Sequence, residues 1–421
     1  MMLAICMRAG YFACAIAITI WAPIAQSDTN TSQNKSVQQL ASLVARTLAT
    51  NPQMQAAQAS VDAASAQLRG TALPLNNPEL EAEAETTDVD TYTLGIRQTI
   101  DWHDKQNAYE QVAQAELTAV EMQFAALRFS KASELLDIIG QLATRHKISL
   151  LSARRTKILK RFTKLAKQRY SAGDISLIDL ELARLSLSEA VMQQAKSGVD
   201  LNQAKSDYFS ISGQLAEEEI ELPDQLPVAL PSALDHMALA QNHPSVKAAH
   251  QSAQAARYQI NAADRERKTD PSFGLAAGRE GEDNLIRLSF SIPLQFRNNF
   301  QSNVDTAQAK ALQADQEAQQ TYRNLLARLN GAQESYKLIA QAWRLWNSQG
   351  RNSLQQRISL LEQLWKAGEV DTTDYLFQVQ QTLNTQISGV ELHGDLWSAW
   401  IDWLSASGTL DIWLNQDNME Q

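Results

Sequence analysis

The stretch YSAGDI at residues 170–175 recurs as WKAGEV at residues 365–370, and this repetition decides the fold. Two weaker matches follow in the same order at nearly the same spacing, namely TLATNP at 47–52 with ALAQNHP at 238–244, and ISG at 211–213 with ASG at 406–408. The glycines of the first and last matches are each separated by 195 residues, so the register is kept across the whole unit. Three matches in order, at offsets of 192, 195 and 195 residues, indicate two tandem structural repeats.

The prolines mark the boundaries of these repeats. No proline occurs between Pro78 and Pro223, and none follows Pro293, as expected if most of each repeat is uninterrupted helix. Three prolines between 223 and 231 follow the acidic residues 217–219 and indicate an irregular linker. The predicted organisation is a first repeat over 28–222, a linker over 223–235, a second repeat over 236–408 and a C-terminal tail over 409–421.

Each repeat is predicted to contain a helix, two short strands, a very long helix, a tight turn and a further helix. Apolar residues recur in steps of four and three from Leu325 to Trp346, which is the spacing of a coiled-coil seam. At 1.5 Å per residue, each long helix would extend for roughly 100 Å. The expected elements are strands over 79–100 and 271–292, long helices over 107–170 and 300–367, and further helices over 174–212 and 371–407.

The N-terminal segment is predicted to be a secretory signal peptide over residues 1–27. Arg8 supplies the positive charge, the run YFACAIAITIWA at 11–22 is apolar, and small residues permit cleavage before Asp28. Both cysteines, Cys6 and Cys14, lie inside this segment, so we expect no disulfide in the exported chain. No later apolar run is long enough for a transmembrane helix. A mature chain that spans a membrane would therefore need a closed β-barrel.

The two predicted hairpins pose a physical problem. They are separated by nearly 200 residues, and an isolated two-stranded hairpin is at best marginally stable in water. We expect other chains to pair with their free edges, because a closed barrel removes every edge. A symmetric oligomer in which each subunit contributes four strands satisfies this requirement, although the sequence does not count the subunits.

Two motifs that lead from strand into long helix carry a family resemblance. They are YTLGIRQTID at 92–101 and LSFSIPL at 288–294, the latter followed by Arg297 and Asn298. With the repeat plan, they resemble the TolC outer-membrane efflux family, and within it the CzcC-like members of heavy-metal pumps. The resemblance implies a mainly α fold with a small β part. It also implies a homotrimer in the outer membrane of a Gram-negative bacterium, with a 12-stranded barrel in the lipid and an α-helical tunnel through the periplasm.

The resemblance also implies a function. The protein is expected to be the passive duct of a tripartite efflux system, fed by an inner-membrane RND-type pump through a periplasmic adaptor. Heavy-metal cations are the favoured substrate, and drug efflux or type I protein secretion through the same duct are alternatives. A periplasmic coiled-coil adaptor is a further alternative, although the β-rich modules of such adaptors are missing here.

The two turns between long helices resemble the periplasmic tips of the family. The resemblance assigns adaptor docking to eight residues, which are Gly173, Asp174, Ile175, Asp179, Gly368, Glu369, Val370 and Asp374. It also makes Asp374 a possible gate residue, while Phe377 stands where relatives such as TolC have a second acid. Glycine permits the sharp reversal, and an acid favours the N-terminus of the next helix. Simple helix capping therefore stays open as the alternative.

The first predicted strand alternates acids with apolar residues. Because side chains alternate between the two faces of a strand, its four acids share one face, namely Glu79, Glu81, Glu83 and Glu85. The lipid-facing side of a membrane barrel must be apolar. We therefore expect these acids to line the lumen or its mouth, where they would favour cations. The alternative is a solvated strand end beyond the membrane.

Other kinds of site are not expected. His236, His243 and His250 are seven residues apart, but two helical turns cover about 10.5 Å, which is too far for one metal ion. No catalytic or phosphate-binding motif appears, so we predict neither an enzyme nor a cofactor. The net charge is −10, and we identify no basic block and no interleaved aromatic patch. Nucleic acid is therefore not an expected partner.

Overall fold

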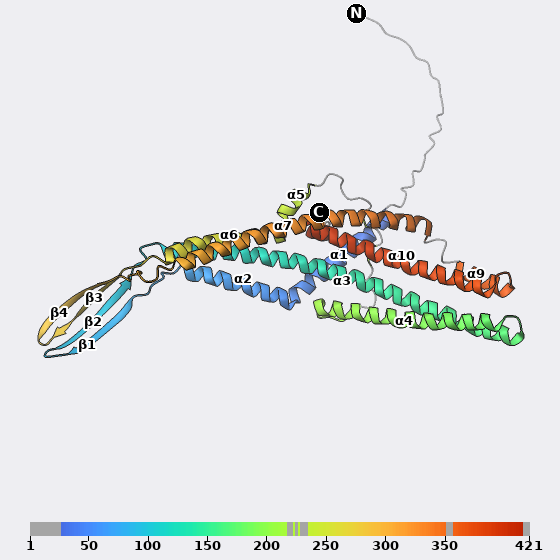
Figure 1. The fold of residues 1–421 in the computed structure, drawn as a ribbon, viewed down its shortest axis with the longest axis horizontal. Helices are drawn as coiled ribbons and strands as arrows, with labels where there is room; N and C mark the ends of the chain where they lie inside the picture. The colour runs from blue at the N-terminus through green and yellow to red at the C-terminus, as the bar shows by residue number, and fades with distance from the viewer. Residues whose placement is uncertain (1–26, 217–221, 224–225, 228–234, 351–356, 416–421) are drawn as a thin grey trace, which may run out of the picture.

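The computed structural model describes residues 27–216, 222–223, 226–227, 235–350 and 357–415. The predicted signal peptide, apart from its last residue, and both cysteines lie outside the described residues, as do most of the linker and the end of the tail. The molecule is elongated, with a small sheet at one end and two helical hairpins at the other (Figure 1). The fold is mainly helical with a small antiparallel sheet, as the sequence predicts.

In the first repeat, the chain runs from the middle of the molecule to the sheet, then to the opposite, helical end (the far end), and back (Figure 1). Its elements are α1 (Ser27–Thr50), α2 (Pro52–Thr71), β1 (Glu79–Thr86), β2 (Asp90–Thr99), α3 (Lys105–Ala172) and α4 (Leu177–Ser212). Helix α3 has 68 residues, which corresponds to about 100 Å. It is the longest element described and connects the sheet to the far end.

The second repeat has the same plan with one difference. Its elements are α5 (His236–Asn242), α6 (Pro244–Glu266), β3 (Ser272–Glu280), β4 (Asp283–Ser291), α7 (Gln301–Leu345), the π-helical turn η1 (Trp346–Gly350), α9 (Arg357–Ala367), α10 (Thr372–Ser407) and α11 (Leu410–Leu414). The long helix predicted over 300–367 is therefore interrupted by a π turn after Leu345, and its residues 351–356 lie outside the described part of the chain. The indole of Trp346 lies where a side chain on Gly389 of α10 would be, so this bulky residue packs directly on the facing helix. Single π turns of this kind are often functional features of long helices.

The two hairpins pair with each other. Strand β2 pairs antiparallel with β3, which gives one four-stranded sheet of order β1-β2-β3-β4. The expectation that the hairpins are isolated within one chain is therefore wrong, because the long helices bring distant segments to the same end of the molecule. The outer edges of β1 and β4 have no partner strand among the described residues. In the described part of each chain, two strand edges are therefore unpaired, those of β1 and β4, instead of four.

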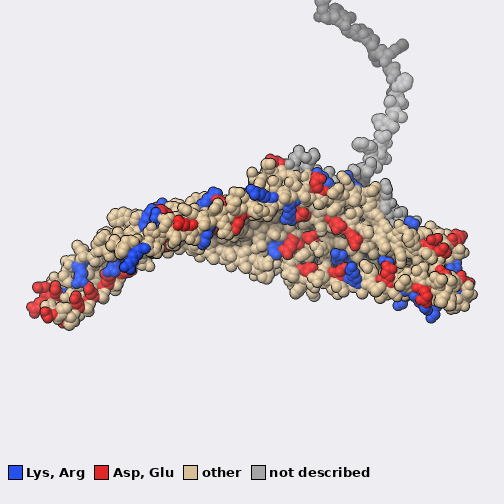
Figure 2. Space-filling view, in the orientation of Figure 1, with Lys and Arg blue, Asp and Glu red and all other residues tan. Residues whose placement is uncertain are grey.

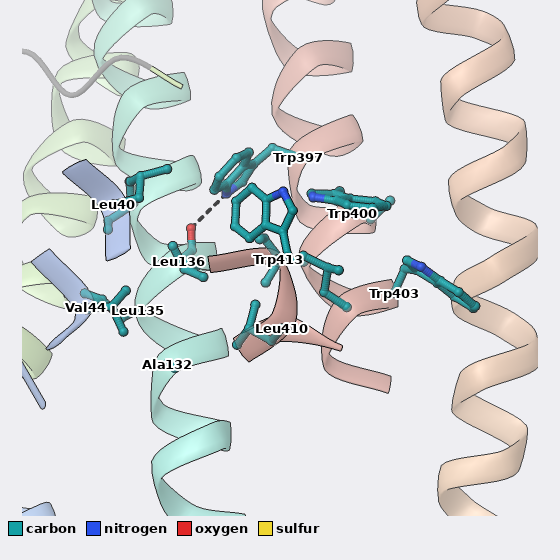
Figure 3. Close-up of a cluster of buried hydrophobic side chains, with 14 of the residues drawn as sticks. Leu40, Val44, Ala132, Leu135, Leu136, Trp397, Trp400, Trp403, Leu410 and Trp413 are labelled. Carbon is teal, nitrogen blue, oxygen red and sulfur yellow. Dashed lines mark hydrogen bonds between the residues drawn. The ribbon is translucent and has the colours of Figure 1, made fainter. Parts of the chain in front are cut away.

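The main core lies where the two repeats meet near the middle of the molecule. Trp397 of α10 is fully buried against α3, and its indole Nε1 donates to the carbonyl of Leu136 at 2.8 Å (Figure 3). Gly140 of α3 makes room for this indole, because a Cβ there would overlap the ring. Trp400 and Trp413 complete the cluster with edge-to-face contacts (Figure 3). A second, separate core joins α3, α4, α9 and α10 near the far end.

In the described part of the chain, no helix combines the length and the apolar character needed to cross a bilayer.

Candidate functional site

One face of the sheet is polar. The register aligns Glu81 of β1 with Gly95 of β2, Ala276 of β3 and Arg287 of β4, and directly opposed residues share a face. The same register places all four predicted glutamates on this face. The face carries six carboxylates and two guanidinium groups in total, and they are Glu79, Glu81, Glu83, Glu85, Glu280, Asp283, Arg97 and Arg287. The face is therefore strongly acidic, as the alternation in the first strand predicts.

Two of the glutamates form ion pairs across the sheet. Glu81 pairs with Arg97 of the neighbouring strand, and Glu83 pairs with Arg287 of β4. Glu79 and Glu85 form no ion pair with a described residue and are exposed. Further acids gather at the hairpin turns, so the hairpin end of the sheet is the most acidic part of this view (Figure 2).

Glycines show that the sheet curls toward its polar face. A Cβ on Gly95 would lie 2.5 Å from that of Ala276 on the next strand, about half the usual separation of opposed Cβ atoms. A Cβ on Gly278 would overlap the backbone of Tyr92, and one on Gly274 would overlap the hydroxyl of Ser289. Crowding on one face means that this face is concave. The acids and arginines therefore lie on the inside of the curve.

The opposite face is apolar and exposed. Its large side chains come from all four strands, and they are Leu80, Tyr92, Leu94, Ile96, Phe273, Leu275, Ile286, Leu288 and Phe290. Their exposed fractions run from 43% for Phe273 to 80% for Leu288, whereas Thr93 on the polar face is only 7% exposed. A sheet of a water-soluble subunit shows the reverse pattern. An apolar surface of this kind needs a covering, which is either lipid or another protein.

The turns at the far end are built as the sequence predicts. Gly173 and Gly368 have φ values of 85° and 81°, in the left-handed region that favours glycine. After each glycine, the next backbone N–H donates to a carbonyl five residues earlier, from Asp174 to Arg169 at 2.9 Å and from Glu369 to Leu364 at 3.0 Å. This is a hydrogen bond of the Schellman type, which closes a helix end.

Two of the acids after these glycines take part in helix caps. Asp179 forms a capping box with Ser176, in which each side chain accepts from the other residue's backbone N–H. In the second turn the capping side chain is Asp371, which accepts from the backbone N–H of Asp374 at 2.7 Å. The sequence interpretation missed both capping residues, although Ser and Asp three positions before an acid are a recognisable signal. Asp374 and Phe377 are both exposed at this end.

The two turns are held together by contacts between the repeats. Arg169 of α3 donates to the carbonyls of Trp365 at 3.0 Å and Lys366 at 3.2 Å, and lies over the Trp365 ring at 4.6 Å. Phe162 stacks on Tyr375 at 4.7 Å, and burial raises the pKa of this tyrosine to about 12. Ile175 and Val370 pack against the same core. The predicted tip residues therefore form one joint end surface.

The histidines have separate structural roles. His236 contacts Asn330 at 2.6 Å, while the Nε2–H of His243 donates to the carbonyl of Ser405 at 2.9 Å. Burial lowers the pKa of His243, and the nearby charge of Arg328 also lowers it. Among the described residues, no three acids, histidines or cysteines are grouped closely enough to hold a metal ion.

The sequence analysis also overlooked a basic segment. The run RRTKILKRFTKLAKQR at residues 154–169 contains eight cations and no acid, within a chain of net charge −10. Counting charges in a window of about four helical turns identifies it directly, whereas the count over the whole chain hides it. The statement that no basic block exists is therefore wrong, and this segment lies near the predicted tips.

Comparison with known proteins gives a consistent result for this architecture. Residues 237–409 match the family described as outer membrane efflux protein. The structure is similar to that of the Campylobacter jejuni CmeC outer membrane channel, with a TM-score of 0.74, 14% identity, and coverage of 96% of this chain and 94% of that one. The chain has the fold of these channels.

Two other solved structures support the same fold. The channel CusC is similar with a TM-score of 0.71 and 17% identity over 88% of this chain and 92% of that one. The outer-membrane channel OprN is similar with a TM-score of 0.73 and 17% identity over 91% and 92%. Among curated protein sequences, none matches the chain. The matched family and these structures are described as efflux proteins and channels and not as enzymes, in agreement with the sequence prediction.

Proposed function

We propose that the protein is one subunit of a homotrimeric outer-membrane duct through which a tripartite efflux system discharges its substrate. The observation that carries this proposal is the two-faced sheet with open edges. Its apolar face is exposed, its acidic face is concave, and β1 and β4 have no partner strand among the described residues. Three copies would join β4 of one subunit to β1 of the next and close a twelve-stranded barrel.

In such a barrel each face meets the medium that it suits. The apolar face would contact lipid and the acidic face would line the lumen. The crowding at Gly95, Gly274 and Gly278 supports this choice, because small residues on the inner face allow a sheet to curl into a barrel. The four glutamates of β1 would then belong to the lumen, with the proteinaceous tunnel continuing through the long helices into the periplasm.

Heavy-metal cations are the substrate class that we propose. The excess of carboxylates over guanidinium groups on the concave face favours cations in the lumen. In the described residues, no helix could span the inner membrane, and we identify no nucleotide-binding motif in the sequence. The driving energy would come from an RND-type pump, with a periplasmic adaptor docked at the joint tips. Asp374, exposed at this end, is the residue that we propose for the entrance.

Conductance measurements on the purified oligomer in a planar bilayer test the proposal. We expect stable channels that prefer cations, and a weaker preference when Glu79→Gln and Glu85→Gln remove the two unpaired acids of β1. Glu121→Gln, an exposed acid on helix α3, is the matched control and should leave the preference unchanged. A monomer that stays in the periplasmic fraction and gives no conductance would disprove the duct.

Export from cells separates the substrate classes and tests the tips. In a strain lacking its own duct, the wild type should restore resistance to metal ions more than to drugs. Gly173→Val with Gly368→Val should abolish export and preserve the trimer, because valine is strained at positive φ. Gly198→Val, at an open helical position of ordinary φ, is the control. Export that persists in the double variant would show that the tips are assigned wrongly.

A further inference from the structure

The basic segment of α3 forms one surface beside the tips. Six of its cations are exposed, and they are Arg154, Lys157, Lys160, Arg161, Lys164 and Lys167. Their spacing of three and four residues places them along one side of the helix. They lie between about 9 and 28 Å from the turn at Gly173, at 1.5 Å per residue. The joint end surface below them is acidic, so the charge changes sign along the helix.

Most of this charge is unbalanced within the chain. Arg161 pairs with Glu362, which also binds Lys366 at 2.8 Å. Burial alone would raise the pKa of Glu362, but hydrogen bonds and charges from these two cations lower it. The carboxylate is therefore ionised and already paired with both cations. The other five exposed cations form no ion pair with a described residue. An acidic partner from outside the chain would therefore find them available.

The surface contains a groove that suits a helix. A hollow of about 330 Å³ lies between α3 and α9, two helices that run in the same direction toward the tips. Its rim carries Arg154, Lys157 and Arg161, and its α3 wall includes the half-buried Ile158 and Leu165. The lining on α3 runs from Arg154 to Leu165, a rise of about 17 Å, which is close to three turns of a bound helix.

The groove does not suit nucleic acid. Its aromatic residues are Phe162, Trp365 and Tyr375, which are 3%, 1% and 1% exposed and already stacked on one another. Bases of single strands bind on exposed aromatic faces, and none is free here. An apolar ridge flanked by acids would satisfy both the wall and the cations, which is the arrangement of an amphipathic helix in a groove.

We propose that this surface binds an acidic amphipathic α-helix of a partner protein, in the groove between α3 and α9. The site is distinct from the tips and lies between α3 and α9, whose course toward the helical end can be followed in Figure 1. The inference rests on the proposed function in one respect, which is that this end is the one that partner proteins reach. Several cations acting together would speed association, and the binding would weaken as the salt concentration increases.

Binding of designed peptides to the detergent-solubilised full chain tests this proposal. The probe is a labelled helical peptide of about 18 residues with leucines on one face and glutamates beside them. We expect it to bind, and to bind roughly tenfold or more weakly after Arg154→Glu with Lys157→Glu. Lys196→Glu with Lys205→Glu, two exposed lysines of α4, is the matched control and should keep the wild-type affinity. Circular dichroism checks that both variants stay folded.

Three results would overturn the proposal. One is equal binding of a peptide with lysines in place of the glutamates, and another is equal binding of unstructured polyglutamate, which would indicate a general polyanion surface. The third is loss of the oligomer in Arg154→Glu with Lys157→Glu, which would make the segment a contact between subunits. Conductance in bilayers, measured on the same samples, reports separately whether the duct itself is correct.

Discussion

Helices α4 and α10 are equivalent in the two repeats, but they have opposite surroundings. Each has 36 residues, and they end at the left-handed glycines Gly213 and Gly408. Helix α10 packs between α3 and α7 and is largely buried, whereas α4 packs mainly on α3 at the edge of the molecule (Figure 1). The repeat therefore fixes where a helix begins and ends, but not whether it is central or peripheral.

Tryptophans show the difference residue by residue. Trp397 and Trp400 of α10 are buried, and the residues 195 positions earlier on α4 are the exposed Asn202 and Lys205. On its outer side α4 instead carries exposed apolar residues seven apart, namely Ile178, Leu185, Met192 and Val199. Seven-residue spacing is that of a seam which packs on another helix. The edge helix thus carries an exposed apolar row, whereas α10 has only the isolated exposed Phe377 among its large apolar residues.

The largest expected effect comes from Trp397. Trp397→Ala should lower the free energy of unfolding by about 3–5 kcal/mol, because it leaves a cavity and removes the donor to the Leu136 carbonyl. Asn202→Ala at the equivalent place on α4 should change it by less than about 0.5 kcal/mol. Chemical denaturation of the purified chain, followed by circular dichroism, measures both. Equal losses would show that the two helices are buried alike.

The second test exchanges residues at the π-helical turn. Gly389→Gln introduces the residue found 195 positions earlier, at Gln194, and its Cβ would lie 2.5 Å from the indole of Trp346. We expect a loss of about 1–3 kcal/mol from this overpacking. Adding Trp346→Leu, which copies Leu151, should recover part of that loss. If the two effects are simply additive, the indole and the glycine are not coupled.

These two pairs also show how much of the fold the sequence predicts. Repeat matching placed the turns at Gly173 and Gly368 because their backbone requires glycine locally. The same spacing of 195 residues aligns Trp397 with Asn202, but such an alignment does not show which helix lies between two others. The pairing of β2 with β3 was missed for the same reason, since it depends on both long helices ending at one place. The acidic face was predicted correctly because strand alternation is local.

The third test compares the caps at which the two repeats begin their inner helices. Asn51 accepts from the backbone N–H of Gln53 at 2.9 Å and donates to the carbonyl of Ile211 at 3.0 Å. His243 accepts from the backbone N–H of Ser245 at 3.2 Å and donates to the carbonyl of Ser405 at 2.9 Å. Both side chains cap a helix and fasten it to the end of α4 or α10. Only the histidine can gain a proton.

The folded protein should therefore lose stability in acid through the second repeat. Burial lowers the pKa of His243 below its usual 6.5, so the folded state favours the neutral ring. Its contribution is complete above pH 6.5 and is lost as the pH falls from there toward the lowered value. His243→Asn should make the unfolding free energy less dependent on pH between 7 and 5, and Asn51→His should make it more so. An unchanged slope in both variants would refute the role of these caps.

The smallest effect within a subunit is expected on the outer side of α4. Met192→Lys with Val199→Lys should change the stability of the isolated chain by less than about 0.5 kcal/mol, because both side chains are exposed. If this seam contacts a neighbouring subunit, the same variant should weaken the oligomer, as measured by light scattering in detergent. Leu312→Lys, an exposed leucine on α7 nearer the sheet, serves for comparison. An oligomer of undiminished stability would exclude the seam from the subunit contact.

The sequence by itself determined the features that depend on neighbouring residues in the chain. These are the two repeats, the glycine turns, the long helix α3, and the alternation that gathers four glutamates on one face. The tertiary structure alone decided which hairpins pair, which equivalent helix is central, and where the basic side of α3 meets α9 to form a groove. The reason is physical, because backbone geometry and side-chain period act over a few residues. Burial and charge balance, in contrast, depend on groups that approach only when distant helices pack together.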